Sequence, residues 1–161
     1  MDKNNLVVDR AAHEYTMSRV FDAPRELVWK ACTDPELLAS WWGPRYLTTV
    51  VDKYELKVGG VWRFIQKDAK GNEYAFNGVI KEIVAPERFS YTFEFEPMAG
   101  HISTDTMILE ELPDGKTRII ARTTFTSLED LEGMLQSGME GGAVESWDRL
   151  EELLESVRKE K

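Results

Sequence analysis

The chain has 161 residues and a formal net charge of −9, with 42% hydrophobic and 30% charged residues. This balance is typical of one globular domain with a single core, and it excludes a disordered chain. No stretch reaches the roughly 20 apolar residues that span a membrane, and the N-terminus lacks the pattern of a signal peptide. We expect one soluble, cytoplasmic domain over residues 1–161, with a flexible leader at 1–12 and a folded body at 13–158.

The charge and the single cysteine restrict the classes of partner and cofactor. A strongly acidic chain without a basic stripe repels a nucleic-acid backbone, so we expect no nucleic-acid partner. Cys32 has no cysteine to pair with in the chain, and we interpret it as a small buried hydrophobic residue. Two histidines are too few for a metal site without several carboxylates, so no metal and no cofactor are expected.

The first part of the chain predicts one strand followed by two short helices. Residues 13–21 favour a strand, and Asp22 is an N-cap candidate with Pro24 near the first turn of a helix. The segment Thr33-Asp34-Pro35 ends this helix and starts a second one that runs through Trp41.

The middle of the chain predicts an antiparallel sheet, because β-rich runs are separated by turn signals about every ten residues. The expected strands are 48–57, 61–67, 74–84, 88–96, 102–111 and 117–125. Connections this short cannot hold parallel crossovers, so the strands form a meander. Trp62 and Phe64 alternate with Arg63, which indicates one aromatic face and one solvated face.

The last part of the chain predicts a long amphipathic helix, because apolar residues from Ser127 onward recur every three or four positions. The aromatic face of the sheet must curl around this helix to cover its apolar stripe. Gly138, Gly141 and Gly142 each cost roughly 1 kcal/mol relative to alanine in a helix interior. They indicate either a break before a regular helix at 144–159 or small residues that leave room for a ligand, and both can hold together.

Several local motifs in combination resemble those of the START-like, Bet v 1-like (SRPBCC) superfamily. They are Arg19-Val20-Phe21-Asp22-Ala23-Pro24, Val28-Trp29-Lys30-Ala31, Thr33-Asp34-Pro35, Trp41-Trp42-Gly43-Pro44 and Gly59-Gly60-Val61-Trp62-Arg63-Phe64. From about Tyr15 to Leu154, the chain is most similar to the group named for the activator of Hsp90 ATPase.

The resemblance implies the α+β helix-grip fold. In this fold a curved antiparallel sheet, here of seven strands, surrounds a long C-terminal helix, and two short helices follow the first strand. Members of the superfamily hold lipids, sterols, polyketides or hormones, so the fold implies a ligand-binding cavity but does not identify the ligand.

Large aromatic and methionine side chains on the expected inward surfaces are the candidate ligand-binding residues. They are Trp42, Tyr46, Trp62, Phe64, Phe76, Tyr91, Phe93, Met107, Met134, Met139 and Trp147. Apolar pockets with a few polar groups are the usual form of small-ligand sites. The alternative is that these side chains only fill the core.

Catalytic motifs are absent from the sequence, which contains no nucleophile elbow, zinc-protease motif, phosphate-binding loop or dinucleotide fingerprint. His101 is the candidate general base, and it would need an orienting carboxylate from Asp105 or from the final helix. Glu140 and Glu145 could point inward or outward. A buried carboxylate with a raised pKa would favour proton-transfer chemistry.

Three functions are consistent with these features. The first is a non-enzymatic protein that carries, sequesters or senses a hydrophobic small molecule, such as a lipid, between the sheet and the final helix. The second is an enzyme of cyclase or dehydratase type, which a cluster of polar side chains deep in the cavity would favour. The third is a protein-interaction role in stress response, with an Hsp90-like chaperone or a second copy of the chain as partner.

Overall fold

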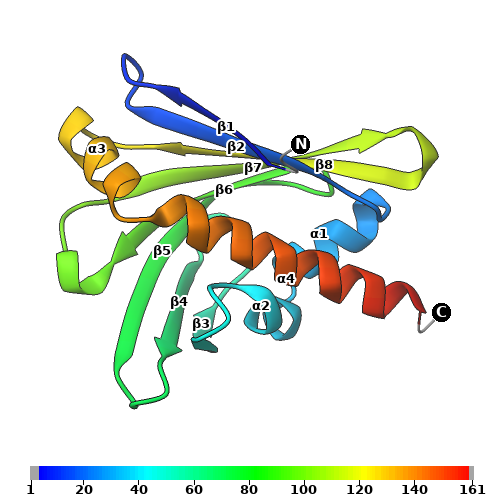
Figure 1. The fold of residues 1–161 in the computed structure, drawn as a ribbon, viewed down its shortest axis with the longest axis horizontal. Helices are drawn as coiled ribbons and strands as arrows, with labels where there is room; N and C mark the ends of the chain where they lie inside the picture. The colour runs from blue at the N-terminus through cyan, green and yellow to red at the C-terminus, as the bar shows by residue number, and fades with distance from the viewer. Residues whose placement is uncertain (1–3, 160–161) are drawn as a thin grey trace.

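One curved antiparallel sheet forms most of the fold, and the last helix lies along its concave side (Figure 1). The computed structural model describes residues 4–159. The strands are β1 (Asn4–Asp9), β2 (Glu14–Phe21), β3 (Thr48–Tyr54), β4 (Val61–Lys67), β5 (Glu73–Val84), β6 (Arg88–Phe95), β7 (Ser103–Leu112) and β8 (Lys116–Thr124). The helices are α1 (Arg25–Thr33), α2 (Pro35–Trp41), α3 (Leu128–Gln136) and α4 (Met139–Lys159), with short 3-10 turns η1 (Glu96–Met98) and η2 (Pro113–Gly115). In the described part of the chain, no helix is long and apolar enough to cross a membrane.

The sheet has eight strands in the order β1-β2-β8-β7-β6-β5-β4-β3. Strands β3 to β8 form the meander predicted from the short connections, and β2 adds to it beside β8. The prediction of seven strands is wrong, because residues 4–9, which we assigned to a flexible leader, form β1 along the edge of β2. Burial alternates along β1, and Leu6 packs against the core. The edge of β2 thus orders a segment whose own sequence signal is weak.

The two short helices begin and end at the expected places, but one cap differs. The N-cap of α1 is Pro24, so the expected placement of Asp22 at the N-cap position is wrong. Asp34 accepts a hydrogen bond of 2.9 Å from the backbone N–H of Glu36 and caps α2.

Gly138 divides the C-terminal helical region into α3 and α4. Its φ of +85° is a left-handed conformation that glycine adopts readily, and it stops α3. The expected break is present, but it lies earlier than expected, because α4 already begins at Met139. Helix α4 then continues through Gly141 and Gly142.

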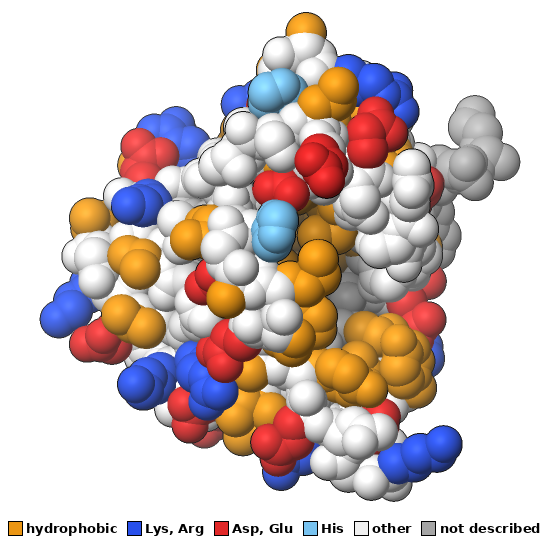
Figure 2. All heavy atoms as spheres, turned by 90° about the vertical axis from the view of Figure 1, so that its left-hand side faces the viewer, with side chains coloured by type: hydrophobic (Ala, Val, Ile, Leu, Met, Phe, Trp, Pro, Cys, Tyr) orange, Lys and Arg blue, Asp and Glu red, His pale blue; other side chains and the backbone are white. Residues whose placement is uncertain are grey.

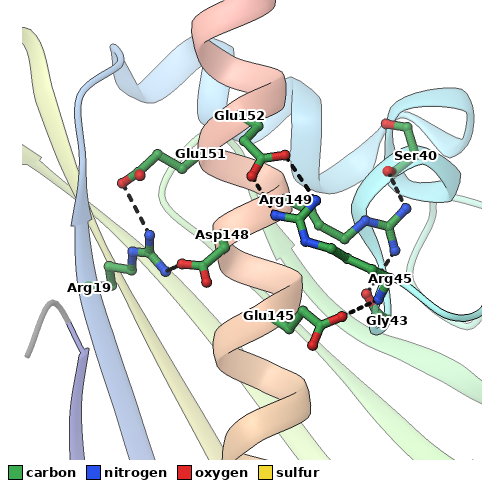
Figure 3. A network of polar contacts seen from close by, with 9 residues as sticks. All are labelled: Arg19, Ser40, Gly43, Arg45, Glu145, Asp148, Arg149, Glu151 and Glu152. Carbon is green, nitrogen blue, oxygen red and sulfur yellow. Dashed lines mark hydrogen bonds and ion pairs between the residues drawn. The ribbon is translucent and has the colours of Figure 1, made fainter.

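Helix α4 is fixed to the sheet by an aromatic contact and by the ion pairs of a buried arginine with two partly exposed acids. The ring of Trp147 lies edge-on to Phe21 of β2, with the ring centroids 5.8 Å apart. Beside this contact, the side chain of Arg19, which has no solvent exposure, reaches Asp148 at 2.8 Å and Glu151 at 3.2 Å (Figure 3). The two layers are therefore joined by both apolar and charged groups.

Helix α4 also holds the loop that follows α2. Arg149 donates hydrogen bonds to the carbonyl oxygens of Ser40 and Gly43 at 2.7 and 2.8 Å (Figure 3). The hydroxyl of Ser146 accepts a hydrogen bond of 2.9 Å from the backbone N–H of Gly43. These contacts place the loop between α2 and β3 against the helix, where it forms one wall of the candidate site.

Candidate functional site

A cavity of about 370 Å³ lies between the concave face of the sheet, α4 and the loop after α2. Most of its wall is apolar, and it is partly open to solvent. Figure 2 shows the end of the molecule that carries α3, where hydrophobic side chains gather along a hollow. The space that the fold leaves beneath α4 is thus large enough for a small molecule.

A smaller cavity of about 70 Å³ adjoins the first one, and Trp41, Trp42, Tyr91 and Met107 line both. Cys32 lies in the wall of the smaller cavity. It is 2% exposed, and burial raises the pKa of its thiol to about 12. The prediction that Cys32 is buried is confirmed.

The structure brings most of the predicted ligand-binding side chains to these two cavities. The larger cavity is lined by Trp42, Phe76, Tyr91, Phe93, Met107, Met134 and Trp147. Trp62 and Phe64 line only the smaller one and belong to the buried core. The inward placement of Tyr46 is wrong: it is 73% exposed, in a turn where no strand or helix period fixes the direction of a side chain. Met139 begins α4, and its side chain lies outside the described part of the structure.

Four polar side chains form a row across the wall of the larger cavity, one from each of four adjacent strands. Tyr91 of β6 pairs with Asp105 of β7, Asp105 with Thr123 of β8, and Thr123 with Tyr15 of β2. Directly opposed residues of antiparallel strands share a face and lie about 4.5–5.5 Å apart at their Cβ atoms. We call Tyr15, Tyr91, Asp105 and Thr123 the polar row, and all four line the cavity.

Asp105 carries the charge of the polar row. Its Oδ1 is buried and has no hydrogen-bond partner within residues 4–159. Burial raises the pKa of the carboxyl to about 6, although hydrogen bonding by Thr123 and Tyr91 favours the charged form. Burial, and after it the charge of Asp105, raises the pKa of both Tyr15 and Tyr91. At neutral pH the row therefore combines an ionised carboxylate with two protonated tyrosines.

The candidate general base and the two glutamates considered from the sequence are not among the described residues that line the cavity. His101 is exposed, and its Nδ1 lies 2.8 Å from the carboxylate of Asp130 on α3. The carboxylate beside His101 is therefore Asp130 and not Asp105. Glu140 is exposed, and Glu145 accepts a hydrogen bond from a backbone N–H of the loop after α2. Neither glutamate supplies the pocket carboxylate.

Tyr15 and Thr123 are absent from the predicted site, and Asp105 was considered only as a possible partner of His101. The alternation of side chains along the strands nevertheless indicates that they face inward. Asp105 lies two residues before Met107, and Tyr15 lies two residues before Met17, so each shares the inward face of its strand. A carboxylate at an inward position of an apolar face is the feature that would have identified the polar row.

Family comparison agrees with the motifs in the sequence. A sequence model of the family described as Activator of Hsp90 ATPase homolog 1-like protein matches residues 22–155. The chain belongs to this family. The match to this AHSA1-like family extends from the segment before α1 into α4, so it includes most of the cavity wall but not β2. Comparison with curated proteins gave no significant match.

Solved structures share the fold of this AHSA1-like chain over almost its full length. A protein from Arthrobacter aurescens is 26% identical, with a TM-score of 0.86 and coverage of 94% of this chain and 91% of that chain. A protein from Mycobacterium smegmatis is 27% identical, with a TM-score of 0.84 and coverage of 95% and 98%. The AHSA1 protein from Silicibacter pomeroyi is 25% identical, with a TM-score of 0.72 and coverage of 88% and 96%. Proteins with this fold bind hydrophobic ligands or interact with other proteins.

Proposed function

We propose that this AHSA1-like chain binds a hydrophobic small molecule in the larger cavity, as a carrier, a sequestering protein or a sensor. The observation that carries the proposal is the cavity itself: it is about 370 Å³ in volume, and half of its lining residues are aromatic residues or methionines. Small-ligand sites are usually apolar hollows of about 300–1,000 Å³ with a few polar groups.

The surface of α4 supports this proposal, because small residues line the cavity where larger ones would fill it. Gly142, Ala143 and Ser146 contribute to the wall. A Cβ atom added at Gly142 would meet no heavy atom within 4 Å. Glycine at this position lowers helix propensity by roughly 1 kcal/mol relative to alanine, without a close contact that requires it. The open space beside it is the property that a ligand would use.

A pair of glycine substitutions tests the proposal. Gly142→Leu places a large side chain in the cavity, whereas Gly141→Leu makes the same change at an exposed neighbour on the same helix. Both gain helix propensity, so only the cavity distinguishes them. We expect the fluorescent apolar probe N-phenyl-1-naphthylamine to bind the wild type and Gly141→Leu alike, and to bind Gly142→Leu at least about tenfold more weakly. Equal binding to both variants would contradict a ligand site beneath α4.

The polar row favours a second candidate function, an enzyme of cyclase or dehydratase type. Asp105 is a base of useful strength in an apolar site, because its pKa is raised to about 6. With a β-hydroxy ketone, its carboxylate would take the proton next to the carbonyl, and the hydroxyl would leave with that proton as water. The carboxylate is then restored.

This second candidate is tested by incubating the protein with 4-hydroxy-4-(2-naphthyl)butan-2-one and following the loss of one water by mass spectrometry. Turnover by the wild type and its loss in Asp105→Asn would support the enzyme. Thr126→Val, an exposed change outside the row, is the control that should keep the wild-type rate. A rate that is unchanged in Asp105→Asn would exclude Asp105 as the base.

A further inference from the structure

The polar row places one negative charge in a cavity whose wall offers nothing to neutralise it. The described lining residues include no lysine, arginine or histidine, and Asp105 is the only carboxyl group among them. The other titratable groups that face the cavity are Tyr15 on β2 and Tyr91 on β6. From α4, across the cavity, the wall receives uncharged residues such as Ala143 and Ser146. The carboxylate therefore has no counter-ion in the described wall.

The buried Oδ1 of Asp105 is a free acceptor in this wall. A buried acceptor without a donor costs free energy, and the cost is larger when the group is charged. The neighbouring row on the same face of the sheet is apolar, since Met17 pairs with Ala121 and Ala121 with Met107. The wall thus offers one strong polar contact next to an extended apolar surface.

We propose that the cavity takes an apolar molecule with one hydrogen-bond donor, a hydroxyl or an amine, which donates to Oδ1 of Asp105, and that it discriminates against apolar anions. This inference rests on the proposed function, because it names the class of ligand for the same cavity. A donor that reaches the carboxylate makes a charge-assisted hydrogen bond, which is stronger than a neutral one. An anion instead meets a like charge at low dielectric. An apolar alcohol therefore binds better than the corresponding carboxylate or sulfonate.

Three naphthalene probes of similar apolar surface separate these effects. In the first, 2-naphthol, a hydroxyl donates; 2-methoxynaphthalene has no donor; and 2-naphthalenesulfonate is an anion at every pH used. Affinities are measured by titration calorimetry for the wild type, Asp105→Leu and Asp105→Asn. In the wild type near neutral pH, we expect 2-naphthol to bind about tenfold tighter than 2-methoxynaphthalene, and 2-naphthalenesulfonate to bind most weakly.

In Asp105→Leu, the preference for 2-naphthol should fall below about twofold and the disadvantage of 2-naphthalenesulfonate should decrease. Asp105→Asn removes the charge and keeps an acceptor oxygen, so its preference should be intermediate. The proposal is overturned if the wild type shows no preference for the donor, or if the full preference persists in Asp105→Leu.

A second readout uses the wild type alone and does not depend on the folding of a variant. Between about pH 8 and about pH 5 the Asp105 carboxyl gains its proton, while Tyr15 and Tyr91 stay protonated throughout. The affinity of 2-naphthalenesulfonate relative to 2-methoxynaphthalene should therefore rise about fivefold on acidification. A constant ratio overturns the inference.

The two proposals can fail separately. If 2-methoxynaphthalene binds the wild type and Gly142→Leu abolishes its binding, the proposed function stands even when no donor preference is found. If none of the three probes binds the wild type, both the proposed function and the donor preference are overturned.

Discussion

Asp105 is a single residue that lowers the stability of the fold. The pKa of its carboxyl is raised from 3.8 to about 6, chiefly because burial disfavours the charged form. Below about pH 4 the group is protonated in both the folded and the unfolded chain. As the pH rises from about 4 to about 6, the unfolded chain loses this proton first, so the free energy of unfolding decreases. Above that range the decrease in the free energy of unfolding caused by the Asp105 carboxylate is constant, at most about 3 kcal/mol.

Replacing this carboxyl by an amide should therefore stabilise the protein at high pH. We expect Asp105→Asn to raise the free energy of unfolding by about 1–3 kcal/mol near pH 8, with the gain falling toward zero near pH 4. Urea denaturation at several pH values measures the difference. Asp114→Asn, in an exposed turn, is the matched control and should show no such pH-dependent gain. A loss of stability in Asp105→Asn near pH 8 would mean that the carboxylate is net stabilising.

Strand alternation predicts the direction of many single side chains, but not which of them border the larger cavity. Phe64 and Phe93 were both expected to face inward, yet Phe64 is 4% exposed in the core and Phe93 lines the larger cavity. The difference depends on the distance between the sheet and α4, and the spacing of residues along one strand does not reveal this distance. The same alternation does reach Asp105, whose polarity at an inward position is readable from the sequence.

At the scale of whole elements, segments with a clear alternation of apolar and polar residues are predicted well, whereas segments with a weak pattern are not. The strand expected at 61–67 is observed as Val61–Lys67, because alternating aromatic residues and flanking turns define it. Strand β1 has only six residues, and its order comes from pairing with β2, which the local sequence does not encode. Gly138, Gly141 and Gly142 have equal helix propensity, so the sequence shows that a break is near but not which glycine makes it.

The cavity is a property of the whole molecule, because its wall joins distant parts of the chain. Tyr15 comes from the second strand and Trp147 from the last helix, and the loop after α2 closes the wall between them. The order of elements along the chain and the resemblance to the helix-grip fold predict that α4 lies along the concave face of the sheet. The distance between α4 and the sheet is known only from the structure. Whatever fixes α4 to the sheet therefore also fixes the width of the cavity.

Arg19 is one of the residues that fix α4 to the sheet. Leaving its buried charge unpaired should lower the free energy of unfolding. Its guanidinium has no solvent exposure, lies 5.3 Å from the ring centre of Phe21, and pairs with Asp148 and Glu151 of α4 (Figure 3). Removing both acids with Asp148→Ala and Glu151→Ala leaves a buried positive charge without its partners. We expect this double variant to lose about 3–5 kcal/mol of unfolding free energy.

Arg19→Met removes the buried charge instead and keeps a long apolar side chain between β2 and α4. The side chains of the two acids are already 42% and 32% exposed in the wild type, so water can solvate them when the arginine is absent. This variant should therefore remain within about 1–2 kcal/mol of the wild type in urea denaturation, and should be clearly more stable than the double variant. If Arg19→Met is the more damaging change, the ion pair itself, and not only the need to neutralise a buried charge, holds α4 to the sheet.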